Sequence, residues 1–409
     1  MPWKETCVME ERMRFVMEVK EGFYSKAQLC RTYGISRPTG DKWLERYALS
    51  GVEGLRDLSR APLCHPNEVG EDLERRILAV RGLHGHWGPK KILAYLEGQS
   101  PEGGWPARST IGALLQRLNL SVPRKRRRRA PPHTEPFAAC DGPNAVWCTD
   151  FKGWFRTGDG LRCDPLTISD AFSRYLFRCQ ATDVRGEIVE PLFVAAFREY
   201  GVPWAILSDN GSPFASRGIG GLSRLSVSWV KLDIVVERIA PGHPEQNGRH
   251  ERMHLTLKQE TASPPAATGR AQQKVFNRFR REFNEERPHE ALDQRTPASV
   301  YRPSPRVYPE RLGPVEYPCG VDARCVQKHG EFYWKGNVVF LGEALRHERI
   351  GLEAIDGRHW MLWFSRLALG VFDGYLGKVM TWRQAAKVGI AKPTKDNGQD
   401  KGGTDDDDE

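Results

Sequence analysis

The segment RKRRRRAPPHTEP, from Arg124 to Pro136, constrains most strongly how this chain can fold. Its six consecutive cations repel one another, and its prolines have no backbone N–H group to give to a helix or sheet. A run of this kind is typical of a solvated linker. We therefore predict a basic, Pro-rich linker at residues 123–140 with separate folded units on either side. The 409 residues of the chain also exceed what one compact core accommodates.

Residues 1–62 are predicted to form a helix-turn-helix unit. The stretch SKAQLCRTYGISRPTGDKWLERY indicates a short helix from Ser25 to Tyr33, a turn at Gly34 and a second helix with Ser36 as its N-cap. The second helix of such a unit can enter the DNA major groove. Its residues that would then face bases or phosphates are Arg37, Thr39 and Lys42. Any small helical hairpin shares this pattern, so a purely structural hairpin is the alternative.

Residues 63–122 are predicted to form a second helix-turn-helix unit, built from three helices within DLERRILAVRGLH, GPKKILAYL and ARSTIGALLQRLNL. A plain three-helix bundle is the alternative. The cations of this unit and of the linker that we expect to contact DNA are Lys90, Lys91, Arg108, Arg124, Lys125, Arg126, Arg127, Arg128 and Arg129. The first 130 residues hold 24 Lys and Arg against 15 Asp and Glu, while 37 of each follow. This imbalance predicts that the N-terminal part grips a polyanion, with an affinity that falls as salt rises.

Several classes of protein are disfavoured by the composition. No apolar run approaches the roughly 18 to 20 residues that span a bilayer. The first residues, MPWKETCVMEERMRF, are too charged for a secretory signal. The nine cysteines include no Cys-x-x-Cys pair, which argues against a zinc ribbon and against a disulfide framework. We expect a cytoplasmic, nucleoid-associated protein with no membrane partner.

The sequence changes from helical to β-rich patterns at about Asn144. AVWCTDFKGWF, LRCDPLTISD and RYLFRCQAT are three consecutive β-rich runs, and further strands then alternate with helices. This order predicts a mixed five-stranded sheet with helices on both faces. After Pro318 short strands return, with hairpin signals at KGN and DG, and predict a small β-barrel at residues 318–378. Residues 379–409, which end in GGTDDDDE, are predicted to be a disordered acidic tail.

Three acidic residues of this β-rich region are candidates for chemistry. Asp150 lies within the first strand, Asp209 ends a later strand in LSDNGSPF, and Glu251 follows the Gly248 turn on a helix. Each acid taken singly has a structural explanation, because a turn tolerates Asp, Asn and Gly. If the three converge, they repel one another, and divalent cations relieve that repulsion. Oxygen ligands alone favour Mg²⁺ or Mn²⁺.

Five motifs of this region together resemble those of the bacterial insertion-sequence transposases of the DDE type. They are VWCTDFKG, SDAFSRYLF, GVPWAILSDNGSPF, PGHPEQNGRHERMHLTLKQE and FNEERPHEALDQRTPASVY. The catalytic core of that family is similar to retroviral integrase and has a ribonuclease-H-like fold. The resemblance covers about residues 5 to 375 and implies a catalytic core at residues 141–305. It implies that Asp150 bridges two Mg²⁺ ions (Mn²⁺ may substitute), that Asp209 binds one and that Glu251 binds the other. Around this trio, Lys258 is expected to hold a phosphate and His254 to contact DNA; a solvated lysine and a histidine that only caps packing are the alternatives. The residues expected to shape the loops are Asn210, Gly211, Asn247 and Gly248.

The chain departs from the family pattern in one interval. Between Asp209 and Glu251 lie 41 residues, more than is usual in the family. We expect the extra residues within 215–232, where RGIGG at 217–221 can loop out without moving either acid. Glu245 and Glu260 are rival third ligands. Glu251 is preferred because it follows the Asn-Gly turn by the family's interval.

The resemblance implies a DNA transposase. Such a protein binds the terminal inverted repeats of its element and catalyses metal-dependent 3′-end cleavage and strand transfer into target DNA. A homodimer or larger assembly is expected, because two ends must be joined together. One alternative is a sequence-specific DNA-binding regulator with an inert core. Another is a metal-dependent nuclease or RNA-hybrid hydrolase on the same fold.

Overall fold

The computed structural model describes residues 7–59, 69–121, 140–240, 246 and 248–393. The chain divides into two compact units, Met1–Gly70 and Glu71–Glu409. Among the residues described, none of the helices has the length and apolarity needed to cross a bilayer. Three predicted features lie outside the described residues. They are the linker cations Arg124 to Arg129, the loop residues Glu245 and Asn247, and the domain boundary at residues 62–63.

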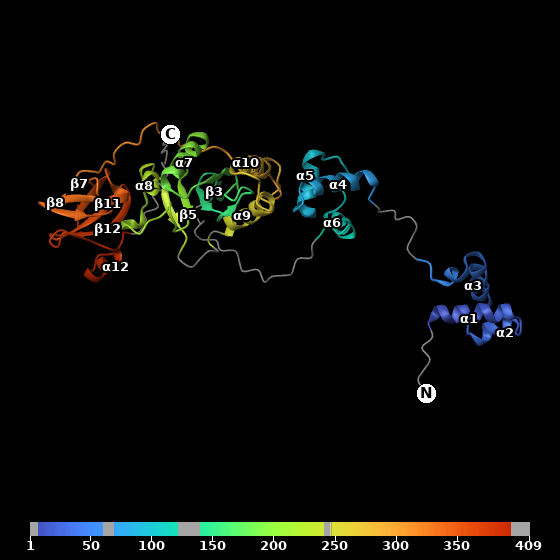
Figure 1. Cartoon of the computed structure of the whole chain (residues 1–409). Helices are drawn as coiled ribbons and strands as arrows, with labels where there is room; N and C mark the ends of the chain where they lie inside the picture. Colours follow the sequence, from blue (N-terminus) through green and yellow to red (C-terminus); the bar gives the residue numbers. More distant parts are fainter. Residues whose placement is uncertain (1–6, 60–68, 122–139, 241–245, 247, 394–409) are drawn as a thin grey trace, which may run out of the picture. The chain divides into compact units, whose positions relative to one another are not determined.

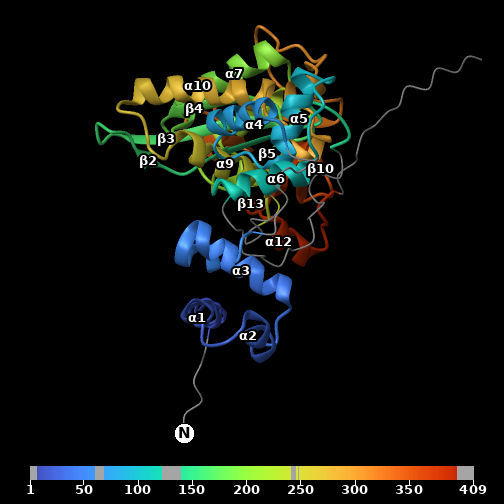
Figure 2. The ribbon, with the colours of Figure 1, turned by 90° about the vertical axis from the view of Figure 1, so that its right-hand side faces the viewer.

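The first unit is helical, and its helices pack around one small core (Figure 2). Its elements are α1 (Val8–Glu21), α2 (Lys26–Thr32), α3 (Arg37–Ser50) and the 3₁₀ turn η1 (Gly51–Leu55). Ser36 caps α3 as predicted, and Gly34 takes the left-handed backbone conformation of the turn, with φ +64°. Gly40 allows α3 to lie close to α2, because a Cβ there would sit 2.8 Å from the sulfur of Cys30. The predicted hairpin is therefore present.

The second helical group also has its predicted order. It consists of α4 (Glu71–Leu83), α5 (Pro89–Gln99) and α6 (Arg108–Arg117). Pro89 occupies the first turn of α5, where no backbone N–H is needed. The side chains that bury its centre are Ile77, Val80, Ile92, Leu96, Ile111, Leu114 and Leu115.

The centre of the chain is a mixed sheet with helices on both faces, as the sequence predicts. Its strands are β1 (Val146–Phe151), β2 (Phe155–Arg156), β3 (Arg162–Asp170), β4 (Leu176–Thr182), β5 (Ala205–Ser208) and β6 (Val235–Arg238). The order is β2-β3-β1-β5-β6, with β4 also paired to β3. β3 pairs antiparallel with β1 and β4, whereas β5 is parallel to β1 and β6. The five predicted strands are all present, and the short β2 adds a sixth after a break at Gly153, whose φ is +82°.

Alternating side chains divide the core of this sheet into two clusters. On one face Trp147 and Phe177 pack against α7 (Gly186–Tyr200) and α8 (Arg224–Lys231). On the other face Leu176 and Cys179 pack against α9 (Gly248–Thr261) and α10 (Gly269–Glu285). In Figure 1 the strands β3 and β5 accordingly lie between α7 and α8 on one side and α9 and α10 on the other.

Polar contacts fix the ends of this domain. Asp170 is 1 % exposed and accepts hydrogen bonds from the backbone N–H of Asn144 and from Ser173. Asn284 near the end of α10 bonds both the N–H and the carbonyl of Leu176 on β4. The domain extends past its predicted end at residue 305, because Tyr308 and Leu312 pack on the same core.

The C-terminal module is not the predicted β-barrel. Its strands β7 (Val321–Cys325), β10 (Arg349–Ala354), β11 (His359–Phe364), β12 (Leu367–Asp373) and β13 (Lys378–Met380) form one antiparallel sheet in the order β13-β12-β11-β10-β7. The hairpin of β8 (Glu331–Trp334) and β9 (Asn337–Phe340) is a separate sheet. The two sheets share an apolar core through Phe332, Val339, Leu362 and Phe372. In the described part of the chain, however, β8 and β9 pair with no other strand, so the two sheets do not close into a barrel.

The predicted start of the acidic tail, at residue 379, lies within folded structure. Residues 379–393 continue the fold with the end of β13, with α12 (Trp382–Ala385) and with the 3₁₀ turn η7 (Ala386–Val388). Ala385 is completely buried, and Trp382 and Ile390 cover the apolar patch made by Met361 and Val371. An apolar patch of this kind needs a cover, and these residues supply it. Residues 394–409 lie outside the described part of the chain.

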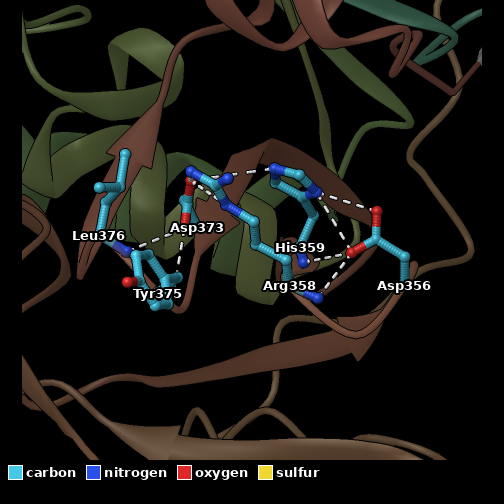
Figure 3. A network of polar contacts seen from close by, with 6 residues as sticks. All are labelled: Asp356, Arg358, His359, Asp373, Tyr375 and Leu376. Atoms are coloured by element: carbon cyan, nitrogen blue, oxygen red, sulfur yellow. Dashed lines mark hydrogen bonds and ion pairs between the residues drawn. The ribbon is translucent and has the colours of Figure 1, made fainter.

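A polar cluster fastens two turns of the C-terminal module to each other (Figure 3). Asp373, at the end of β12, receives two bonds from the Arg358 guanidinium at 2.9 and 2.6 Å. It also accepts the backbone N–H groups of Tyr375 and Leu376. The Arg358 guanidinium lowers the pKa of Asp373 to about 2, and the N–H groups act in the same direction. This cluster stabilises the ends of the sheet.

Between Asp209 and Glu251, residues 217–221 form a short loop that contains the 3₁₀ turn η3 (Ile219–Gly221), as the sequence predicts. The Ser216 N–H closes this loop by bonding the carbonyl of Gly221 at 2.9 Å. In α8, which follows the loop, Trp229 is buried in the central domain, while Val227 and Val230 pack into the core of the C-terminal module. Lys231 also pairs with Glu348 of that module at 3.0 Å. Both apolar faces of α8 therefore have a partner.

Candidate active site

Asp150 lies on the central strand β1, opposite Thr167 of β3. Its side chain is only 19 % exposed. Burial, as the main cause, and the negative charges of Asp209 and Glu251 together raise the pKa of Asp150 to about 7. Both of these carboxylates are therefore close enough to Asp150 to repel its charge.

Asp209 follows directly on β5, the strand that runs parallel to β1. One of its carboxylate oxygens accepts the backbone N–H of Gly211 at 3.1 Å. A Cβ on Gly211 would sit 3.0 Å from the other carboxylate oxygen, so a larger residue there would push against the Asp209 side chain. Asn210 turns the opposite way and donates to the carbonyl of Ile239 at 2.8 Å. Burial raises the pKa of Asp209, and the Gly211 N–H partly offsets that rise. The Asp-Asn-Gly turn thus holds the Asp209 carboxylate through the Gly211 N–H, while Asn210 bonds to Ile239 instead.

Glu251 is exposed in the first turn of α9, which begins at Gly248. Met253 and Leu257 on the same helix are buried against the sheet, as the sequence predicts. Lys258, two turns after Glu251, is exposed. Glu251 and Lys258 therefore share the outer side of the helix.

His254 does not lie on that outer side, so the prediction that it contacts DNA is wrong. His254 is only 6 % exposed, and His250, one helical turn earlier, is 2 % exposed. The Nε2 atoms of both rings lie 2.7 Å from the Thr167 hydroxyl. The Nδ1 atom of His254 lies 3.8 Å from a carboxylate oxygen of Asp150. Burial lowers the pKa of His250 to about 3 and that of His254 to about 2, so both rings are neutral near pH 7.

Sequence reasoning missed Thr167 and His250. The available signal was the spacing of His250 and His254, which places both on one face of a helix together with Met253 and Leu257. A threonine inside an apolar strand carries no comparable signal, because its importance depends on which helix covers it. Glu260, a rival third ligand, is committed elsewhere, since it pairs with Arg287 at 2.5 Å.

A divalent cation suits the chemistry of these acids. In the described part of the chain, no group of three His, Cys, Asp or Glu side chains has the spacing needed to hold an ion. The acids around Asp150 are nevertheless oxygen donors, and together they raise its pKa. A cation that binds them would relieve that repulsion, and all-oxygen sites favour Mg²⁺ or Mn²⁺.

The predicted DNA-contacting residues of the helical units differ in exposure. Arg37 and Lys42 on α3 and Arg108 at the start of α6 are exposed. Thr39 is half-buried, and its hydroxyl contacts that of the N-cap Ser36 at 2.8 Å. Thr39 is therefore part of the helix cap.

The two lysines at the start of α5, which are predicted to contact DNA, have other interactions within the protein. Lys90 forms an ion pair with Glu290 at 2.5 Å. Burial lowers the pKa of Lys91 to about 7, and the nearby Arg287 charge acts in the same direction. A phosphate would have to displace Glu290 to reach Lys90.

Comparison with known families places domains on both halves of the chain. Residues 141–244 and 232–297 match integrase core domains. Residues 11–62 match a helix-turn-helix domain, and residues 39–115 match a homeodomain-like domain. The chain therefore has an integrase core preceded by helix-turn-helix domains, a combination that resembles the transposase and integrase class.

One relative found by sequence comparison comes from an insertion element. The chain is 27 % identical over 256 residues to the insertion element IS407 uncharacterized 31.7 kDa protein of Burkholderia multivorans, covering 60 % of this chain and 87 % of the relative. Together with the domain matches, this confirms the resemblance to insertion-sequence transposases with an integrase-like core.

Solved structures show only distant similarity. The HTLV-2 integrase catalytic core domain in complex with magnesium matches with a TM-score of 0.28 and 16 % identity, over 39 % of this chain and 96 % of that one. The simian T-cell lymphotropic virus intasome in complex with a PP2A regulatory subunit matches with a TM-score of 0.34 and 14 % identity, over 73 % and 95 %. Similarity at this level does not bear on activity.

Proposed function

We propose that this protein is a DDE transposase with Asp150, Asp209 and Glu251 as its catalytic acids. It would bind the terminal inverted repeats of its element, cleave the 3′ ends in a metal-dependent reaction and transfer them into target DNA. The single observation that carries the proposal is the pKa of Asp150, raised to about 7 partly by the charges of Asp209 and Glu251. A site that keeps three mutually repelling acids near one strand end is suited to divalent cations.

The residues of the chain have distinct parts in this mechanism. Two Mg²⁺ or Mn²⁺ ions bound by the three carboxylates would supply activation of the attacking oxygen and stabilisation of the leaving 3′ oxygen. Asp150, Asp209 and Glu251 would together hold these ions. Lys258, exposed on the same side of α9 as Glu251, would bind a phosphate near the scissile bond. The attacking group is water for end cleavage and the freed 3′-OH for joining.

DNA recognition belongs to the helical units. The exposed Arg37, Lys42 and Arg108 support contact with the element ends, and the cations Arg124 to Arg129 would add affinity that depends on salt. A dimer or larger assembly would bring two ends together, because joining requires both. The protein would act on the DNA of its own cell.

The test is cleavage of a duplex that carries the coding region and its flanks, with Mg²⁺ or Mn²⁺ and purified protein. Breaks mapped to the nucleotide should occur at two inverted flanking sequences. Glu251→Gln should reduce cleavage by at least about 100-fold while end binding stays close to wild type, because the amide cannot carry the carboxylate charge that a metal needs. Glu187→Gln is the matched control, since Glu187 is also an exposed glutamate in the first turn of a helix of this domain.

Three outcomes would contradict parts of the proposal. Tight binding of the flanks without breaks under either metal would favour a regulator with an inert core. Cleavage without joining to a second duplex would favour a nuclease. Unchanged cleavage by the Glu251→Gln protein would remove Glu251 from the site.

A further inference from the structure

We propose that Thr167, acting through His250 and His254, is a positioning residue that sets the separation of Glu251 from Asp150. This inference rests on the proposed function, because it concerns the geometry of the same acids. Thr167 touches neither DNA nor the reacting atoms, and its effect would pass through the helix that carries Glu251.

Thr167 lies where strand and helix meet. It is completely buried on β3 and stands directly opposite Asp150 in the β1–β3 register. Its hydroxyl donates to the backbone carbonyl of Asp150 at 3.1 Å. The same hydroxyl oxygen lies 2.7 Å from Nε2 of His250 and 2.7 Å from Nε2 of His254. One oxygen thus joins the strand of the first acid to the helix of the third.

The protons of this cluster can be assigned from its contacts. A threonine hydroxyl has one proton and two lone pairs, and a backbone carbonyl can only accept. All three contacts are made when Thr167 donates to Asp150 and each imidazole donates its Nε2–H to Thr167. The Nδ1 atom of His250 is then an acceptor, which agrees with its distance of 3.3 Å from the Ser169 hydroxyl. The Nδ1 atom of His254 is likewise unprotonated and faces the Asp150 carboxylate.

The cluster restrains α9 at two points. His250 immediately precedes Glu251, and His254 follows it by three residues, so the contacts lie about one helical turn apart on one face. A helix held at two such points can neither roll about its axis nor slide along the sheet. Glu251 therefore keeps a fixed height above Asp150. A cluster that contributed stability alone would not need to bracket the catalytic residue.

The test compares Thr167→Val, which has nearly the same shape but no hydroxyl, with Thr167→Ser, which keeps the hydroxyl. The first measurement is the affinity of the full chain for Mn²⁺ in the absence of DNA, detected by electron paramagnetic resonance. The second is the single-turnover rate of end cleavage, and the third is amide hydrogen exchange in α9. Residues that orient metal-binding side chains typically change affinity or rate by about 10- to 100-fold. We expect losses of that size in Thr167→Val and values close to wild type in Thr167→Ser, with faster exchange in the first turns of α9 only in Thr167→Val.

Two further variants identify which ring atom of His254 matters. Glutamine places its amide near the position of Nε2, whereas asparagine places it near that of Nδ1. His254→Gln should keep Mn²⁺ affinity, because it still donates to Thr167, and His254→Asn should lose it. The reverse order would overturn the assignment of the contact to Nε2.

Ser173→Ala controls for lost stability. Ser173 is also completely buried beside β3, and its hydroxyl donates to Asp170 at 2.6 Å. Its removal should lower the melting temperature without changing Mn²⁺ affinity or exchange in α9. If Thr167→Val behaves like Ser173→Ala in every measurement, Thr167 is only structural. If the wild-type chain neither binds Mn²⁺ nor cleaves, the proposed function fails, while exchange in α9 still tests the restraint by itself.

Discussion

Replacing Asp150 by Asn should stabilise the metal-free protein at pH 8 and leave it unchanged near pH 4. In the folded chain, burial and the neighbouring acids raise the pKa of Asp150 from 3.8 to about 7. A group whose pKa is raised on folding gives its full stability below the unfolded pKa. That contribution is lost as the pH rises from about 4 through about 7. Above pH 7 the wild-type chain therefore carries a buried, repelled carboxylate that the amide lacks.

The magnitude follows from the size of the pKa change. A difference of about 3 units at about 1.36 kcal/mol each corresponds to on the order of 4 kcal/mol at pH 8. This is equivalent to roughly a thousandfold slower exchange of amide protons that are exposed only when the domain opens. Because the chain has several folded units, a local probe is better suited than a single unfolding curve.

The assay is amide hydrogen exchange of the full chain, in chelator, read on peptides that span β1 and β3. The ratio of wild-type to Asp150→Asn exchange rates should rise steadily between pH 4 and pH 8. Adding Mn²⁺ should slow exchange in the wild type and not in the variant. A ratio that stays near one at pH 8, or that is equally large at both pH values, would refute the electrostatic account of this site.

Two further predictions concern regions away from the acids. Asp373→Asn should destabilise the C-terminal module by about 1.5–3 kcal/mol at pH 7, because the charge-assisted bond to Arg358 is removed. Since folding lowers the pKa of Asp373 to about 2, this stabilisation is present above about pH 4 and is lost as the pH falls through about 2. Exchange in β12 peptides from pH 7 to pH 2 measures it, and a pH-independent difference would contradict it. Changing Arg124 to Arg129 to neutral residues should weaken end binding and reduce the slope of log affinity against log salt by about 0.9 for each DNA phosphate that the chain no longer neutralises. A changed sequence preference in selection experiments would instead indicate that these side chains lie in a groove.

Much of the fold could be predicted because its signals are local. The apolar runs around Trp147 and Ile206 predict strands, and Ser36 predicts the start of α3. Asp150 and Asp209 each stand out as an acid within or at the end of an apolar strand. The resemblance supplied Glu251, which has no such local signal, since an exposed glutamate in the first turn of a helix is common.

The remaining features depend on which elements pack together. His254 was expected on the DNA side because its spacing from Glu251 allows a shared face. The structure buries it because the sheet offers it Thr167, a partner on a strand more than eighty residues earlier in the chain. The C-terminal strands were predicted correctly as strands, but whether they close into a barrel depends on pairing at the edges of β8 and β9, and the hairpin signals at Lys335 and Gly336 carry no information about those edges.

The long interval between Asp209 and Glu251 is compatible with a site of ordinary geometry. Asp209 is fixed by β5 immediately before it, and Glu251 is fixed by the contacts of α9 with β3. Between these two fixed points lies α8, which packs on the central domain through Trp229 and on the C-terminal module through Val230. Because α8 contacts both cores, the interval joins the C-terminal module to the central domain while β5 and α9 hold the two acids in place.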